Sequence, residues 1–112
     1  MGINHGGSLA IAKKMVDLAS TNGADVIKNQ CHILDKEMIL SAKKVKPTNI
    51  NLSIYEVIKR NHMSFKNEIK LKRYVEKKGL IYLSTPFSIE AAKKLNSIGV
   101  KAFKIGSGEC NN

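Results

Sequence analysis

Hydrophobic and polar positions follow two periods along this chain, one typical of helices and one typical of strands. Three segments, residues 8–22, 65–78 and 88–98, carry their apolar side chains on one helical face. Ser8 and Ser88 stand where helix N-caps are expected, and a glycine follows each segment, at positions 23, 79 and 99. The pattern therefore predicts three amphipathic helices.

Short apolar runs before and between these helices predict four strands. They are the end of a strand at residues 2–5, followed by residues 25–31, 80–83 and 101–105. Alternation of strands and helices is typical of a parallel sheet with right-handed crossovers. The predicted fold class is therefore α/β, and both a doubly wound sheet and a (β/α)8 barrel, which needs about 250 residues, fit the pattern.

Residues 32–64 form the least regular part of the chain and are too long for an ordinary connection. Two short helices are predicted within them, at residues 36–42 and 53–60. A long loop that leaves the carboxyl end of a strand often forms a lid or a substrate wall, and this one could equally cover a strand edge. His32 and His62 lie here without a motif around them, so neither is given a functional role.

The chain is strongly basic, with 19 Lys and Arg against 9 Asp and Glu and a net charge of +10. Such a balance suits nucleic acid, an acidic membrane surface or phosphorylated small molecules. The lysines occur mostly as pairs on the predicted helices, and the aromatic residues do not interleave with them as a base-stacking surface requires. Solvated helix faces explain them most simply, and a basic nucleic-acid-binding module is the alternative.

The lengths of the apolar runs and the spacing of the two cysteines bear on the compartment and redox state of the protein. No apolar run approaches the roughly 20 residues of a membrane span. Cys31 and Cys110 lie far apart without the spacing of a zinc site or a small disulfide scaffold. We therefore expect a cytoplasmic protein with reduced thiols that contacts no membrane.

Polar groups stand at the tips of three predicted strands. Lys28 and Gln30 close one strand and share a face because side chains alternate along it. Thr85 follows the next strand, and Lys104 leads into the turn Gly-Ser-Gly at residues 106–108, where the backbone can approach a ligand closely. Cations and hydroxyls in this arrangement predict an anion-binding site, and the spacing excludes a P-loop.

Four segments in order resemble one known family. They are Gly-Ile-Asn-His-x-Gly at 2–7, Val-Ile-Lys-x-Gln at 26–30, Leu-Ser-Thr-Pro-Phe at 83–87 and Phe-Lys-Ile-Gly-Ser-Gly-Glu at 103–109. The ordered set is similar to the N-terminal half of the sialic acid synthase (N-acetylneuraminate synthase) family, over essentially all of residues 1–112. Gly6 departs from the polar or acidic residue expected there. The resemblance implies the first half of a TIM (β/α)8 barrel, about four β/α units.

The resemblance also implies a reaction and a site. Family members condense phosphoenolpyruvate with N-acetylmannosamine, or a related N-acetylated hexosamine, to a nine-carbon sialic acid and phosphate, with Mn²⁺ or Mg²⁺ polarising the aldehyde. It implies that Lys28 reaches both substrates and is the catalytic candidate, and that Gln30 contacts the amino sugar. Phosphoenolpyruvate would be bound by Ser84, Thr85, Lys104 and Ser107. Asn4, His5 and Glu109 belong to the motifs too, with loop-fixing roles as the equal alternative.

The resemblance further implies that much of the enzyme lies outside these residues. The glutamate before the first motif, the two metal-binding histidines, the second half of the barrel and the small C-terminal domain that reaches across a homodimer have no counterpart here. We expect the isolated chain to be inactive, and to be poorly soluble, to self-associate or to occur only as part of a longer product. A legionaminic or pseudaminic acid pathway fits as well as a sialic acid pathway, and a non-functional gene remnant is a further alternative.

Overall fold

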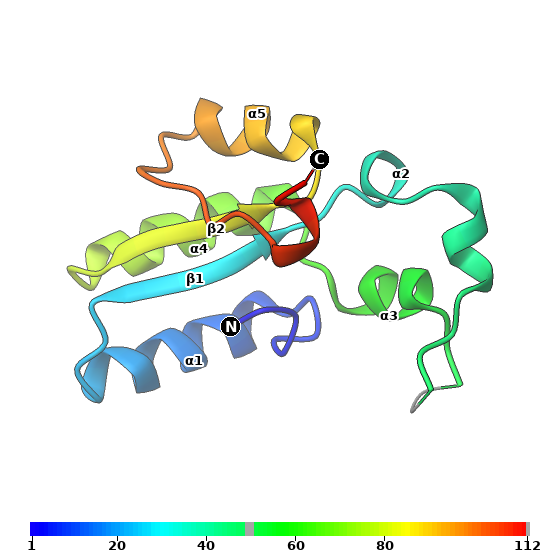
Figure 1. The fold of residues 1–112 in the computed structure, drawn as a ribbon. Coiled ribbons are helices and arrows are strands. Elements are labelled where there is room, and N and C mark those ends of the chain that lie inside the picture. The colour runs from blue at the N-terminus through cyan, green and yellow to red at the C-terminus, as the bar shows by residue number, and fades with distance from the viewer. Residues whose placement is uncertain (49–50, 112) are drawn as a thin grey trace.

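The structure, a computed structural model, describes residues 1–48 and 51–111 and shows a small parallel sheet surrounded by helices (Figure 1). Within these residues, two strands and five α-helices follow one another, with two short 3-10 helices, η1 and η2. In chain order the elements are α1 (Leu9–Thr21), β1 (Val26–Cys31), α2 (Leu34–Glu37), η1 (Leu40–Lys44), α3 (Ile54–Asn61), α4 (Phe65–Lys77), β2 (Ile81–Pro86), α5 (Ile89–Ser97) and η2 (Ser107–Glu109).

Serine side chains begin the long helices, and the caps at Ser8 and Ser88 are those that the sequence predicts. The hydroxyls of Ser8, Ser64 and Ser88 each accept a hydrogen bond from the backbone three residues further on, at α1, α4 and α5. Ser53 begins α3 in a capping box, because Glu56 in turn accepts from the Ser53 backbone. The three predicted amphipathic helices and the second short helix are thereby confirmed.

The two strands pair in parallel, from Val26 opposite Ile81 to Cys31 opposite Pro86. Their carboxyl ends therefore meet at one edge of the sheet. The segment from α2 to α3 and the C-terminal turn both lie beyond that edge (Figure 1). The predicted parallel α/β arrangement is confirmed, and it gathers the strand tips into one region.

The hydrophobic core lies between one face of the sheet and the helices α1, α4 and α5. Its members alternate along each strand and recur along each helix, which is how a strand and an amphipathic helix share a core. The buried apolar residues of this cluster are Ala12, Val16, Ile27, Cys31, Met63, Leu71, Val75, Tyr82, Ala91, Leu95 and Val100.

The strand predicted at residues 2–5 is wrong, because residues 2–7 form consecutive turns. Backbone hydrogen bonds run from Asn4 to Met1, from Gly6 to Ile3 and from Ser8 to His5. Gly2 and Gly6 have φ values of +59° and +56°, which an extended strand does not use. The buried His5 ring accepts a hydrogen bond from the Gly7 backbone at 3.0 Å, so His5 fixes this loop.

The strand predicted at residues 101–105 is reduced to one bridge, between Phe103 and Ser84. The Lys104 N–H donates to the Ser84 carbonyl at 3.0 Å, while all five side chains are exposed. Among the described residues, this segment bonds to β2 on one side alone and its side chains are exposed, so it lacks the burial that usually stabilises a β-ladder. The described residues therefore contain two paired strands instead of the predicted four.

The short helix predicted at residues 36–42 is also wrong in its bounds. The chain forms α2 at 34–37 and η1 at 40–44, because Met38 between them adopts an extended conformation with φ −132° and ψ 132°. The predicted single helix is therefore interrupted at Met38.

Candidate active-site face

The parallel register decides which predicted site residues share a side of the sheet. Lys28 lies opposite Leu83, and Gln30 lies opposite Thr85. Directly paired residues point to the same face, so Lys28, Gln30 and Thr85 lie together on the face opposite to the helix-covered core. The Ser84–Phe103 bridge places Lys104, one residue further on, on that same face.

Thr85 is the most buried of these groups, with 2% of its surface exposed. Its Oγ1 makes no hydrogen bond to any residue that the structure describes. The backbone of Gly106 packs beside it, since a Cβ built on Gly106 would lie 3.8 Å from Thr85 Cγ2 and 3.4 Å from the Phe87 ring. A buried hydroxyl without a partner is costly, which makes it a natural ligand-binding group.

Ser84 points the opposite way, toward α4. Its hydroxyl and that of Tyr82 both donate to Oε1 of Glu68 at 2.9 Å. Glu68 is 1% exposed, and burial raises the pKa of its carboxyl, while hydrogen bonds from Cys31, Tyr82 and Ser84 oppose the rise. The structure therefore gives the Ser84 hydroxyl a partner in the core and does not bring it to the face of Thr85.

Lys104 and Ser107 are both exposed in this chain. Ser107 begins η2, which is closed by a hydrogen bond from the Glu109 N–H to the Gly106 carbonyl at 2.9 Å. Lys104 is held through its backbone on β2, next to Thr85. Of the predicted anion-binding groups, Thr85 and Lys104 thus share the open face of the sheet near its carboxyl edge.

Sequence reasoning missed a buried cluster at the tip of β1. His32 Nδ1 lies 2.9 Å from Oε1 of Glu37, and its ring stacks on Phe87 with centroids 4.5 Å apart and an interplanar angle of 6°. His32 Nε2 lies 3.5 Å from Oε1 of Gln30. The signal available in the sequence was a histidine directly after the predicted strand at residues 25–31, with a glutamate five residues later.

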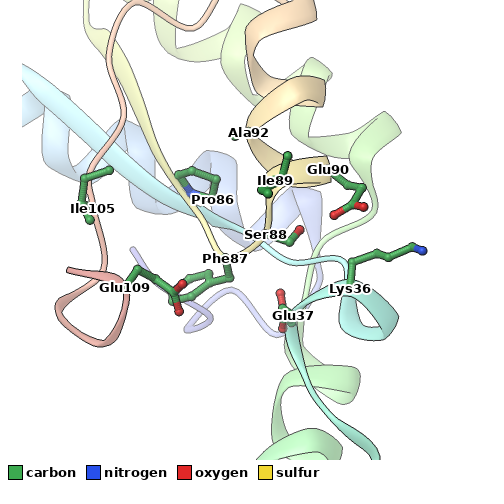
Figure 2. A pocket seen from close by; sticks show the side chains of 10 residues that line it. All are labelled: Lys36, Glu37, Pro86, Phe87, Ser88, Ile89, Glu90, Ala92, Ile105 and Glu109. Carbon is green, nitrogen blue, oxygen red and sulfur yellow. The ribbon is translucent and has the colours of Figure 1, made fainter. Parts of the chain in front are cut away.

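Phe87 lines two of the hollows that adjoin this cluster. The smaller, of about 290 Å³, is lined by Gln30, His32 and Phe87, with apolar side chains of the α2–α3 segment as its wall. The larger, of about 450 Å³, lies between α2, the start of α5 and the C-terminal turn, and Figure 2 shows Glu37 and Glu109 on either side of Phe87. Of the predicted site residues, Gln30 lines the smaller hollow.

Within 1–48 and 51–111, no three histidine, cysteine or acidic side chains gather closely enough to hold a metal ion. The described residues alone therefore do not make a site for the divalent ion that the sequence resemblance implies. No helix in this part of the chain is both long and apolar enough to cross a bilayer.

Parallel β/α units with polar groups at the strand tips are typical of TIM-barrel enzymes. A solved structure supports this class: the N-acetylneuraminic acid (sialic acid) synthetase of Leptospira borgpetersenii, in complex with citrate, superimposes with a TM-score of 0.82 at 31% identity. That match covers 98% of this chain and 35% of the synthetase chain. The chain therefore has the fold of part of a TIM barrel.

The chain belongs to the NeuB family, which it matches over residues 15–112. It is 35% identical to an N,N'-diacetyllegionaminic acid synthase of Campylobacter jejuni, over 99% of this chain and 34% of that protein. It is 32% identical to the N-acetylneuraminate-9-phosphate synthase of Homo sapiens, over 100% of this chain and 32% of that protein. The chain thus spans about a third of the length of these relatives.

Proposed function

We propose that this chain supplies phosphoenolpyruvate-binding and amino-sugar-binding groups to a synthase that joins phosphoenolpyruvate to an N-acetylated hexosamine. The product would be a nine-carbon sialic acid, and phosphate would leave. Family membership and the names of the relatives, which are synthases of legionaminic acid and of N-acetylneuraminate 9-phosphate, support this class of reaction.

The observation that carries the proposal is the buried hydroxyl of Thr85, which has no partner in the described part of the chain, on the face that it shares with Lys28 and Lys104. Phosphoenolpyruvate holds a phosphate and a carboxylate close together, and such a dianion needs fixed cations and oriented donors. Thr85 offers the donor, and the two ammonium groups offer the charge. Lys28 lies beside Gln30 along β1, so it is the group placed to reach both substrates.

Ser84 enters this proposal in a changed role. Its carbonyl accepts the Lys104 N–H, and its hydroxyl is bonded to Glu68. It therefore holds the chain that carries Lys104, while Thr85 and Ser107 supply the hydroxyls for the anion. A divalent Mn²⁺ or Mg²⁺ ion and a homodimeric assembly belong to the same proposal, with the ligands of the ion outside the described residues.

The lysines of the helices favour this proposal over nucleic-acid binding. Lys72 pairs with Glu76 at 2.7 Å, and Lys78 pairs with Asp17 at 2.8 Å. Lys94 lies over the Phe65 ring at 5.4 Å. These lysines are used in contacts on the helix surfaces, which explain them without a nucleic-acid partner.

Binding of phosphoenolpyruvate to the chain tests the anion site directly. Isothermal titration should show that Lys104→Ala weakens binding by about tenfold or more, since a hydrogen bond to a charged group is lost. Lys101→Ala, an exposed lysine three residues away, is the matched control and should bind as the unsubstituted chain does. Equal affinity in both variants would refute the anion site.

Turnover requires the rest of the barrel, so the reaction is tested in a chimera. This chain replaces the corresponding third of the Campylobacter jejuni relative, and phosphate release from phosphoenolpyruvate is measured with and without N-acetylmannosamine or its di-N-acetylated analogues. Release that depends on the amino sugar supports the proposal. A folded chimera that releases no phosphate with any of these sugars contradicts it.

A further inference from the structure

His32 and Glu37 form a buried pair at the carboxyl tip of β1. The two oxygens of Glu37 lie 2.9 and 3.1 Å from His32 Nδ1, and the side chains are 4% and 2% exposed. The Ile33 N–H also donates to Oε2 of Glu37 at 3.1 Å. The carboxylate is therefore fixed by the backbone of the same turn, and it fixes the imidazole in its place.

The orientation of the imidazole is determined on two sides. An ionised carboxylate only accepts hydrogen bonds, so Nδ1 carries the proton that faces Glu37. The ring plane is set by the parallel stack on Phe87, 4.5 Å away. These two restraints leave Nε2 directed at the side chain of Gln30, at 3.5 Å.

Gln30 needs such a neighbour because its carboxamide has two ends of opposite hydrogen-bonding character. In the structure the oxygen end, Oε1, faces Nε2 of His32 at 3.5 Å, and because this oxygen only accepts, Nε2 is the donor of the pair. The NH2 end is then left for the hollow of about 290 Å³ that both side chains line. Met38 and Ile58 form its apolar wall, which suits a neutral ligand with a methyl group.

We propose that His32 and Glu37 are positioning residues that hold the Gln30 carboxamide in one orientation and so select the neutral acceptor sugar. The role in sugar selection rests on the proposed function, whereas the positioning of Gln30 does not. The anion site is expected to be indifferent to this pair, because Thr85 and Lys104 have their own supports on β2.

Gln30 is the sole glutamine of the sequence, which makes the positioning directly observable. Protein labelled with side-chain ¹⁵N-glutamine gives one NH2 signal by NMR. In the unsubstituted chain we expect that signal to be displaced from the free-glutamine position, with cross-peaks to the His32 ring. Absence of both would overturn the proposal without any substitution.

Substitutions then separate stacking from hydrogen bonding. His32→Phe keeps a ring on Phe87 and removes both nitrogens, so the NH2 signal should return toward the free position. Glu37→Gln keeps an oxygen for Nδ1–H and should retain the displaced signal, whereas Glu37→Ala should lose it. His62→Phe, the same change at a ring whose Nδ1 lies 3.0 Å from the Lys59 carbonyl, is the control. An equal response to His62→Phe would overturn the proposal.

Ligand binding tests the consequence for selectivity. In the chimera, His32→Phe should raise the KM for the amino sugar by about tenfold, the effect of one lost hydrogen bond, and leave the KM for phosphoenolpyruvate within about twofold. An increase in both KM values would refute sugar selection. If no variant, including the unsubstituted chimera, turns over, the proposed function fails, and the NH2 signal of Gln30 still decides whether the pair positions it.

Discussion

Neighbouring hydroxyls on β2 should respond to removal in opposite ways. Thr85→Val replaces a buried hydroxyl that has no partner among the described residues by a methyl group of similar size. Ser84→Ala removes a hydroxyl that donates to the buried Glu68 at 2.9 Å. The first substitution should stabilise the protein, and the second should destabilise it.

The magnitudes follow from the burial of each group. An unsatisfied hydroxyl in the interior costs about 1–3 kcal/mol, so Thr85→Val should raise the free energy of unfolding by about 1 kcal/mol after allowance for imperfect fit. Ser84→Ala leaves Glu68 with one donor fewer and should lower the free energy of unfolding by about 1–3 kcal/mol. Ser97→Ala breaks an exposed hydrogen bond and should change it by less than about 0.5 kcal/mol.

Urea unfolding followed by far-UV circular dichroism measures these differences, and titration with phosphoenolpyruvate measures their functional counterpart. Thr85→Val should gain stability and lose affinity for the anion, as expected where a binding group is held unsatisfied. Ser84→Ala should lose stability and keep most of its affinity. A Thr85→Val variant as unstable as Ser84→Ala, or one that binds phosphoenolpyruvate normally, would refute the reasoning.

Two further predictions concern the core and the N-terminal turn. Burial raises the pKa of Glu68 in the folded state, so the folded protein holds that proton more tightly than the unfolded chain does. The free energy of unfolding should therefore fall as pH rises from the ordinary glutamate pKa through the raised one. Chemical unfolding across this pH range should show the fall, and Glu68→Gln should remove it. Gly7→Ala should destabilise the protein more than Gly23→Ala. Both glycines have positive φ, of +75° and +81°, but a Cβ at Gly7 would lie 2.9 Å from a backbone carbonyl, whereas one at Gly23 meets nothing within 4 Å. Thermal unfolding compares the two variants, and equal losses of stability would contradict the clash.

Much of the architecture could be predicted from the chain because it depends on neighbours in sequence. The caps at Ser8 and Ser88, the apolar helix faces and the two central strands are local features, and each was found where the pattern predicts it. The alternation along β1 also puts Lys28 and Gln30 on one face without any knowledge of the fold. The strand predictions fail at residues 2–5, where consecutive turns form, and at residues 101–105, which the described residues pair with β2 on one side alone.

By itself, therefore, the amino-acid order determined the helices, the direction of the strands and the family to which the ordered motifs belong. Only the tertiary structure decided that Thr85 faces the open side while Ser84 bonds to Glu68, and that His32 meets Glu37, Gln30 and the Phe87 ring. The physical reason is that periodicity states which residues share a face of one element, whereas partners far apart in sequence are chosen by the register and packing of several elements at once.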